Sequence, residues 1–160
     1  MDAESKEPAF RSPLYKTVGD AIQHASSVLP GHEEDDARWQ PIVEIGFFIQ
    51  TDPAPIWDFI CRWGSHPDKD LRSAIATCLL EHLLEYHFKR YFPSVEKMVL
   101  SDPMFAQTFR MCWQFGQSSV PDNARRFESL QAGIKHEWKS HEERDAFIAE
   151  LTKEFNSGAD

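Results

Sequence analysis

One stretch of the sequence constrains the fold more than any other: residues 68–92, DKDLRSAIATCLLEHLLEYHFKRYF. It contains neither Gly nor Pro, is rich in Leu, Ala and Glu, and follows a start signal in Pro67 and Asp68. Its apolar side chains recur at spacings of three and four and cover more than half of the helix circumference, which a helix at the edge of a protein would not need. We therefore predict a single central helix over Asp68–Phe92, ended by Pro93.

The segments on either side predict further helices. Trp39–Ile49 has strand propensity as well, but no second strand candidate exists to pair with it. The predicted fold class is all-α, a compact domain of antiparallel helices around the central one. The other expected helices are Pro13–Val28, Trp39–Ile49, Pro53–Trp63 with Gly64 as its stop, Ser94–Leu100, Pro103–Gly116, Ala124–Trp138 and Ser140–Phe155.

The length of 160 residues fits one domain with a proper core, and the hydrophobic content of 41% is that of a globular chain. We expect a loose arm over residues 1–11, a single helical domain over residues 12–156 and a frayed tail over residues 157–160. The polar, acidic start is unlike a signal peptide, and no apolar run approaches the length of a membrane span. Cys61, Cys78 and Cys112 lie far apart and form no CxxC, which predicts reduced thiols and a cytoplasmic protein.

The formal net charge of -9 disfavours binding to a nucleic-acid backbone, which depends on clustered Lys and Arg, and favours a basic partner. Four consecutive carboxylates, Glu33, Glu34, Asp35 and Asp36, form an acidic run before the Trp39 segment. They either complement the positive end of a helix dipole or form a docking patch for a basic protein.

Part of the central stretch resembles a known repeat. Asp68, Asp70, Leu71 and Arg72, followed by the small side chains of Ala74 and Ala76 and by Leu79, resemble the second helix of a HEAT repeat. The resemblance covers about residues 53–92. It implies close packing of helix pairs, with Arg72 reaching an aspartate in the preceding turn. Asp52-Pro53 and Asp102-Pro103 open two similar segments, and their offset is close to the unit length of an α-solenoid.

One group of polar residues on the central stretch invites a chemical interpretation. His82 and Glu85 are three residues apart on one helix face, and with Arg72 they define a possible interhelical pocket for a ligand or a small helical enzyme. His82 and His87 diverge on a helix, so the spacing does not fit a metal site. No nucleophile, phosphate-loop or dinucleotide motif is present. We therefore expect no metal or cofactor, and an enzyme is the less favoured hypothesis.

A second alternative is nucleic-acid binding. Residues 86–92 interleave aromatic and basic side chains, and Arg125 and Arg126 lie in a later helix. Such a mixture can stack on bases and neutralise phosphates, although the same residues at a helix C-terminus also complement the helix dipole.

The leading hypothesis is a non-enzymatic protein-protein interaction module, such as an acidic partner-neutralising or adaptor protein. Aromatic anchors and charged residues dominate the energetics of such interfaces. The predicted partner contacts are the acidic run Glu33–Asp36 with Trp39, Trp63 and Arg90.

Overall fold

The computed structural model describes residues 13–30 and 35–134 and the single positions Glu142, Ala146 and Ala149. Throughout this part of the chain the regular structure is helical and no strand occurs, which confirms the all-α prediction. The predicted arm, the tail, Glu33, Glu34 and most of the predicted helix at Ser140–Phe155 lie outside the described residues. The elements are α1 (Val18–Val28), α2 (Asp35–Gly46), α3 (Pro53–Trp63), α4 (Lys69–Ile75), η1 (Ala76–Leu80), α5 (Glu81–Ser101), α6 (Pro103–Arg110), η2 (Gly116–Ser119) and α7 (Pro121–Ala132).

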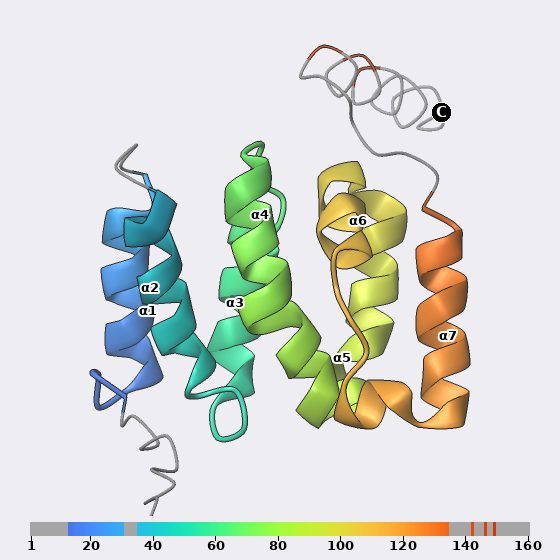
Figure 1. Cartoon of the computed structure of the whole chain (residues 1–160), viewed down its shortest axis with the longest axis horizontal. Coiled ribbons are helices and arrows are strands. Elements are labelled where there is room, and N and C mark those ends of the chain that lie inside the picture. Colours follow the sequence, from blue (N-terminus) through green and yellow to red (C-terminus); the bar gives the residue numbers. More distant parts are fainter. Residues whose placement is uncertain (1–12, 31–34, 135–141, 143–145, 147–148, 150–160) are drawn as a thin grey trace, which may run out of the picture.

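The helices stand side by side in chain order, from α1 and α2 at one end to α7 at the other (Figure 1). α4, the π-helical turn η1 and the first part of α5 form the middle, where they contact α2, α3 and α6. The prediction of a central helical stretch is therefore confirmed. Side chains with no exposed surface fill its core, among them Leu71, Ile75, Leu79, Leu80, Leu83, Leu84 and Phe92.

The prediction that Pro93 ends this stretch is wrong, because α5 runs on to Ser101 with Pro93 inside it. The separate helix expected at Ser94–Leu100 is the end of α5. The backbone leaves helical geometry earlier, at His87 (φ -136°, ψ 40°), and resumes at Phe88. Pro93 then costs the resumed segment one hydrogen bond, to the carbonyl of Lys89, which the surrounding packing tolerates.

Several other boundaries differ from the predictions by a few residues. α1 begins after Thr17, whose hydroxyl accepts from the Asp20 N–H, rather than at Pro13. α6 ends at Arg110 instead of Gly116, and α7 begins at Pro121, which is a favoured first helical residue. Trp39–Ile49 is helical only to Gly46, and because α2 begins at Asp35, Pro41 lies in its interior instead of its first turn.

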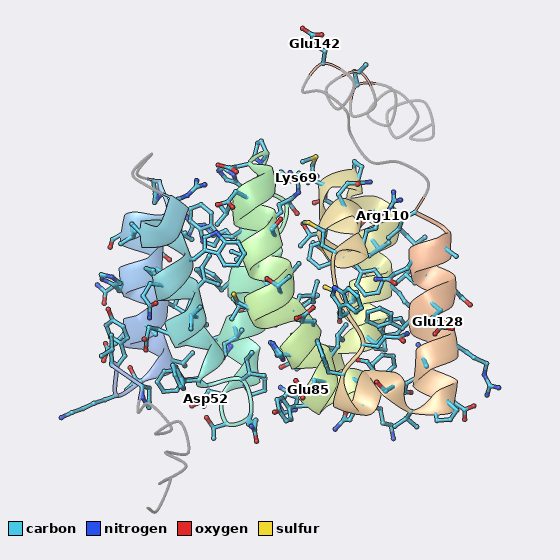
Figure 2. The ribbon with its side chains drawn as sticks, in the orientation of Figure 1. Asp52, Lys69, Glu85, Arg110, Glu128 and Glu142 are labelled. Atoms are coloured by element: carbon cyan, nitrogen blue, oxygen red, sulfur yellow. The ribbon has the colours of Figure 1, made fainter. Side chains whose placement is uncertain are left out.

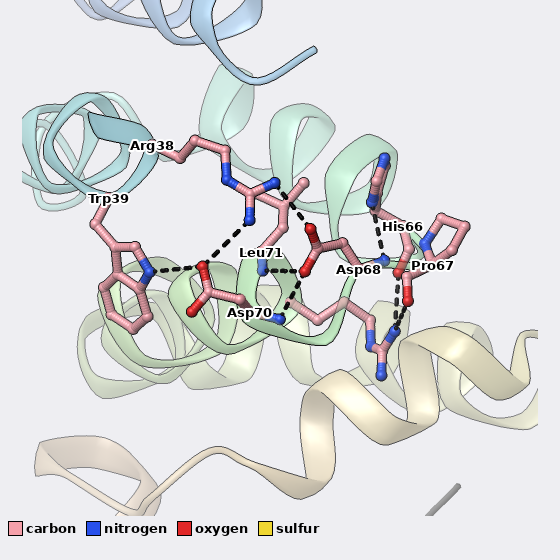
Figure 3. A network of polar contacts seen from close by, with 8 residues as sticks. Arg38, Trp39, His66, Pro67, Asp68, Asp70 and Leu71 are labelled. Carbon is pink, nitrogen blue, oxygen red and sulfur yellow. Dashed lines mark hydrogen bonds and ion pairs between the residues drawn. The ribbon is translucent and has the colours of Figure 1, made fainter. Parts of the chain in front are cut away.

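The first turns of α4 and α6 are capped in the same way. Asp68 Oδ1 accepts the N–H groups of Asp70 and Leu71, while its Oδ2 lies 2.8 Å from Arg38 Nη1 of α2 (Figure 3). Asp102 Oδ1 likewise caps α6, while its Oδ2 accepts from the hydroxyl of Ser65 at 2.6 Å. Each aspartate therefore uses one oxygen for its own helix and the other for an earlier part of the chain.

Arg72, which the resemblance predicts to reach an aspartate, donates to the backbone oxygens of His66 and Pro67. The guanidinium bonded to Asp68 and Asp70 is that of Arg38, which is 6% exposed. Within the described ranges, no helix has both the length and the apolar character that a membrane span requires.

Candidate functional site

A cavity of about 630 Å³ opens between α4, α6, α7 and the loop that follows α6. Its size is in the range of small-molecule sites. We call it the cationic cavity, because basic side chains outnumber acidic ones in its lining. It is lined by Lys69, Arg72, Gln107, Arg110, Met111, Cys112, Trp113, Gln114, Phe127, Glu128 and Gln131.

The basic side chains reach this cavity from the ends of two helices. Lys69 is the first residue of α4, Arg110 is the last residue of α6, and Glu128 lies on α7 (Figure 2). Lys69 and Arg110 are exposed, whereas Arg72 is 4% exposed and held by two backbone oxygens. A cation in the first turn of a helix opposes the helix dipole, so Lys69 is not there to stabilise α4.

Two of the three glutamines that line the cavity differ in their hydrogen bonding. Gln131 donates from Nε2 to the carbonyl oxygens of Phe109 and Cys112, at 3.2 and 2.9 Å, and so satisfies acceptors at the end of α6. Gln107 is buried beside it, at 7% exposure, and its side-chain amide has no hydrogen-bond partner within the described chain. This amide is therefore free to bind a ligand.

The loop after α6 is fixed across the start of α5. The Trp113 N–H donates to Glu81 Oε2 at 2.9 Å, yet the Trp113 residue is 71% exposed. Gly116 has φ +49°, and a Cβ there would lie 2.8 Å from Glu85 Cγ, so the close approach requires glycine. Farther along, the Gln117 amide donates to the carbonyl of Tyr86 and accepts from the N–H of Phe88, which spans the break in α5.

Glu81 is a carboxyl group within the interior. Burial raises its pKa, and the hydrogen bond from the Trp113 N–H opposes that rise. Burial also raises the pKa of all three thiols, that of Cys61 to about 11, so none has the lowered pKa of an activated nucleophile. Within the residues that the structure describes, no three His, Cys, Asp or Glu side chains gather as a metal site would require.

The predicted His82, Glu85 and Arg72 pocket is only partly assembled. His82 Nδ1 lies 2.7 Å from Glu85 Oε2, as the spacing indicated, and the His82 ring stacks on Phe115 with centroids 5.6 Å apart. Arg72, however, lines the cationic cavity, whereas His82 lines a different depression. The three side chains therefore do not share one site, because α5 turns His82 away from the α6 side.

That second depression is an apolar groove of about 450 Å³ between α2, η1 and α5. Val43, Phe47 and Tyr86 along it are 40%, 38% and 40% exposed, so three large side chains present apolar surface to solvent in one groove. Phe115, stacked on His82, lies beside it. The lining consists of Val43, Gly46, Phe47, Ile49, Gln50, Thr77, Cys78, His82 and Tyr86.

The residues predicted to contact a partner differ in their positions and exposure. Asp35 and Asp36 form the first turn of α2. Trp39 is half-buried and donates from its indole to Asp70 Oδ2 at 3.1 Å (Figure 3). Trp63 differs from the prediction that it contacts a partner. It is 8% exposed and packs in the core against Phe59, so it cannot present a surface to a partner.

The aromatic and basic side chains of residues 86–92 do not form a mixed surface. Phe88, Tyr91 and Phe92 are buried, and the ring of Phe92 packs against rings of α6 and α7, so these side chains are not available to stack on bases. Arg90 remains exposed, with its guanidinium over the Tyr91 ring at 5.0 Å. The two later arginines are already paired, Arg125 with Asp122 and Arg126 with Glu96.

Sequence reasoning named Arg72 and His82 but missed most of the other residues that line the two depressions. Lys69 lies far from Gln107 and Arg110 in the sequence and meets them only through the packing of α4 on α6. The one available signal was Lys69 itself, a cation in the first turn of a helix that the Asp68 cap had already identified. Comparison with protein-family models, with curated proteins and with solved structures finds no match for this chain.

Proposed function

We propose that this chain is a non-enzymatic protein-binding module and that the apolar groove between α2 and α5 receives its partner. The observation that carries this proposal is the exposure of Val43, Phe47 and Tyr86 along one groove. Contiguous exposed apolar surface is characteristic of interaction sites, and solitary exposed side chains are not.

The groove has the form that receives an apolar stripe from another protein. Exposed Val43 of α2 and Tyr86 of α5 line it together with small or polar residues such as Gly46 and Thr77. A partner helix would present apolar side chains at spacings of three and four to such a groove. The net charge of -9 favours a partner that is basic around this stripe.

We further propose a HEAT-like architecture, in which consecutive antiparallel helix pairs stack on one another. The order of the helices in Figure 1 and the similar caps of Asp68 and Asp102 support it. Stacked helix pairs commonly present a continuous surface to a partner. The acidic run Glu33–Asp36, of which Asp35 and Asp36 begin α2, is the proposed charged flank of this surface.

The test is an affinity capture from the native host with the intact chain and with the double variant Phe47→Ser, Tyr86→Ser. Both side chains are partly exposed, so circular dichroism should show that the variant remains folded. We expect a protein that the intact chain enriches and the variant does not, and its direct binding should then be measured with both purified proteins.

Leu100→Ser is the matched control, because Leu100 is 80% exposed and lies outside the groove. This control should capture the same protein as the intact chain. A second arm with Glu33, Glu34, Asp35 and Asp36 changed to Ser should weaken capture mainly at low salt. Equal capture by the intact chain and the groove variant, or no direct binding by purified proteins, would contradict the proposed groove.

The alternative hypothesis of a ligand-binding protein is supported by a different observation, the cationic cavity. Nucleic-acid binding is the least supported hypothesis, because the aromatic side chains of Phe88, Tyr91 and Phe92 are buried and Arg125 and Arg126 are paired.

A further inference from the structure

The lining of the cationic cavity has the opposite charge balance to the chain as a whole. The chain has a formal net charge of -9, but Lys69, Arg72 and Arg110 face a single carboxylate, Glu128, around the cavity. Cations gathered around a depression raise the local concentration of anions and stabilise an anion that enters it. The cavity therefore selects for ligands of negative charge.

Two of these cations have no ion-pair partner within the described chain. Arg38, Arg125 and Arg126 are all paired with carboxylates, whereas Lys69 and Arg110 are not. Lys69 stands between Asp68 and Asp70 in the sequence, yet both of these carboxylates are bonded to Arg38 on the other side of α4. The charges of Lys69 and Arg110 are thus available to a ligand.

The amide of Gln107 is a second, independent indication. Gln107 is 7% exposed, lines the cavity and bonds to no described residue. Its amide atoms are not closed off from solvent, so they are open to the cavity. An amide carries both a donor and an acceptor, and a ligand in the cavity can bond to either.

Trp113 supplies an aromatic surface at the same cavity. Its backbone is fixed by the hydrogen bond to Glu81, while the residue is 71% exposed. A large aromatic side chain on an anchored backbone is a stacking platform for a flat ring.

We propose that the cationic cavity binds a small organic anion in which a phosphate or carboxylate group is attached to a flat ring. The anionic group lies between Lys69 and Arg110, the Gln107 amide bonds to a polar atom of the ligand, and the ring packs on Trp113. This site uses none of the residues of the apolar groove and does not rest on the proposed partner binding.

The first experiment titrates the full chain with 1-naphthyl phosphate, 1-naphthoate and neutral 1-naphthol, followed by two-dimensional NMR. The three probes share one ring, so they separate phosphate, carboxylate and uncharged binding. We expect at least one anion to bind with a Kd below about 1 mM and at least about tenfold more tightly than naphthol. The tighter of the two anions identifies the anionic group. Failure of both anions to bind, or equal binding of naphthol, would overturn the proposal.

The second experiment removes the two unpaired cations. Lys69→Met with Arg110→Met should weaken the anion at least about tenfold. Lys89→Met with Lys97→Met removes the same charge from exposed positions of α5 outside the cavity, and should change the Kd by no more than about twofold. An equal loss in both double variants would show that only the overall charge matters and would overturn the proposal.

Gln107→Leu separates ligand binding from folding. Because the Gln107 amide has no partner in the described chain, an apolar side chain of similar size should leave the thermal midpoint unchanged or higher. The same variant should weaken the anion severalfold. If Gln107→Leu binds the anion as tightly as the unaltered chain, the amide has no role and the proposed site is wrong.

Discussion

Asp68 and Glu81 are both drawn into the body of the protein, but their surroundings shift their pKa values in opposite directions. For Asp68, burial acts to raise the pKa, but the bond from Arg38 and two backbone N–H groups outweigh it, and the pKa is lowered. For Glu81, burial dominates the single N–H of Trp113, and the pKa is raised. The number of donors that each carboxylate receives decides the sign.

Asp68→Asn tests the first of these carboxyls. Asn keeps an oxygen for the cap of α4 but loses the charge opposite Arg38, so the free energy of unfolding at pH 7 should fall by about 1–3 kcal/mol. A lowered folded-state pKa stabilises the fold above the unfolded value, near 3.8, and that contribution is lost as the pH falls further. The difference between variant and unaltered chain, measured by urea unfolding, should therefore shrink below about pH 3.8. A difference that stays constant with pH would contradict this account.

Glu81→Gln should behave in the opposite way. A carboxyl whose folded-state pKa is raised above the ordinary 4.5 destabilises the fold once the pH exceeds the unfolded value, and the destabilisation is complete above the folded value. Gln cannot ionise, so the thermal midpoint of the Gln variant should rise relative to that of the unaltered chain as the pH increases above about 4.5. The exposed Glu128→Gln is the control and should show no such trend. A midpoint difference that narrows as the pH rises would refute the assignment.

At the scale of the element, α5 shows why a helix can be interrupted without being lost. The Tyr86 carbonyl and the Phe88 N–H lose their helical partners at the His87 break, and the side chain of Gln117 bonds to both, at 2.7 and 2.9 Å. A side chain inserted into the hydrogen-bond ladder is a recognised cause of helix kinks. The His87 ring itself bonds to the carbonyl of Ile49, at 2.8 Å.

Gln117→Leu removes both of these hydrogen bonds. Since the residue is exposed and water can replace part of the loss, we expect unfolding to become easier by about 1–2 kcal/mol. Gln117→Glu keeps the acceptor for the Phe88 N–H and loses the donor for Tyr86, so its urea midpoint should lie between the other two. Identical midpoints for Leu and Gln at position 117 would show that the break needs no support.

An element could be predicted when the residues that determine it are neighbours in the sequence, and could not when they lie in a distant segment. The starts of α3 and α6 followed from Asp-Pro pairs, because a proline in the first turn acts on its immediate neighbours. The break of α5 at His87 did not, because Gln117, which spans it, lies in a later element. The same distinction holds for the sites. The His82–Glu85 pair was visible at a spacing of three, while Gln107 is brought to Lys69 only by tertiary packing.

At the scale of the whole molecule, the row of helices has a well-buried middle and a lightly held end. Leu79, Leu83 and Leu84 in the middle have no exposed surface, whereas Phe127 is the only buried residue of α7. Phe127 reaches the aromatic rings of Phe92 and Phe109. Local opening should therefore require less free energy in α7 than in the middle of the row.

Hydrogen exchange followed by NMR or mass spectrometry tests this gradient. The amides of η1 and the first turns of α5 should exchange most slowly, near the rate set by global unfolding, and those of α7 should exchange faster. Phe127→Leu should accelerate exchange in α7 more than in α5. Uniform protection from α2 to α7 would indicate that the row opens only as one cooperative unit.

Asp68 and Asp102 each cap their own helix and also bond to a residue earlier in the chain, which bears on the order of folding during synthesis. Arg38 is synthesised before the helix whose cap it holds, and Ser65 is synthesised before α6. As the chain leaves the ribosome, each of these two helices meets a partner that has already emerged, and neither has to wait for residues still to be translated. The fold can then be completed in the order in which it is made.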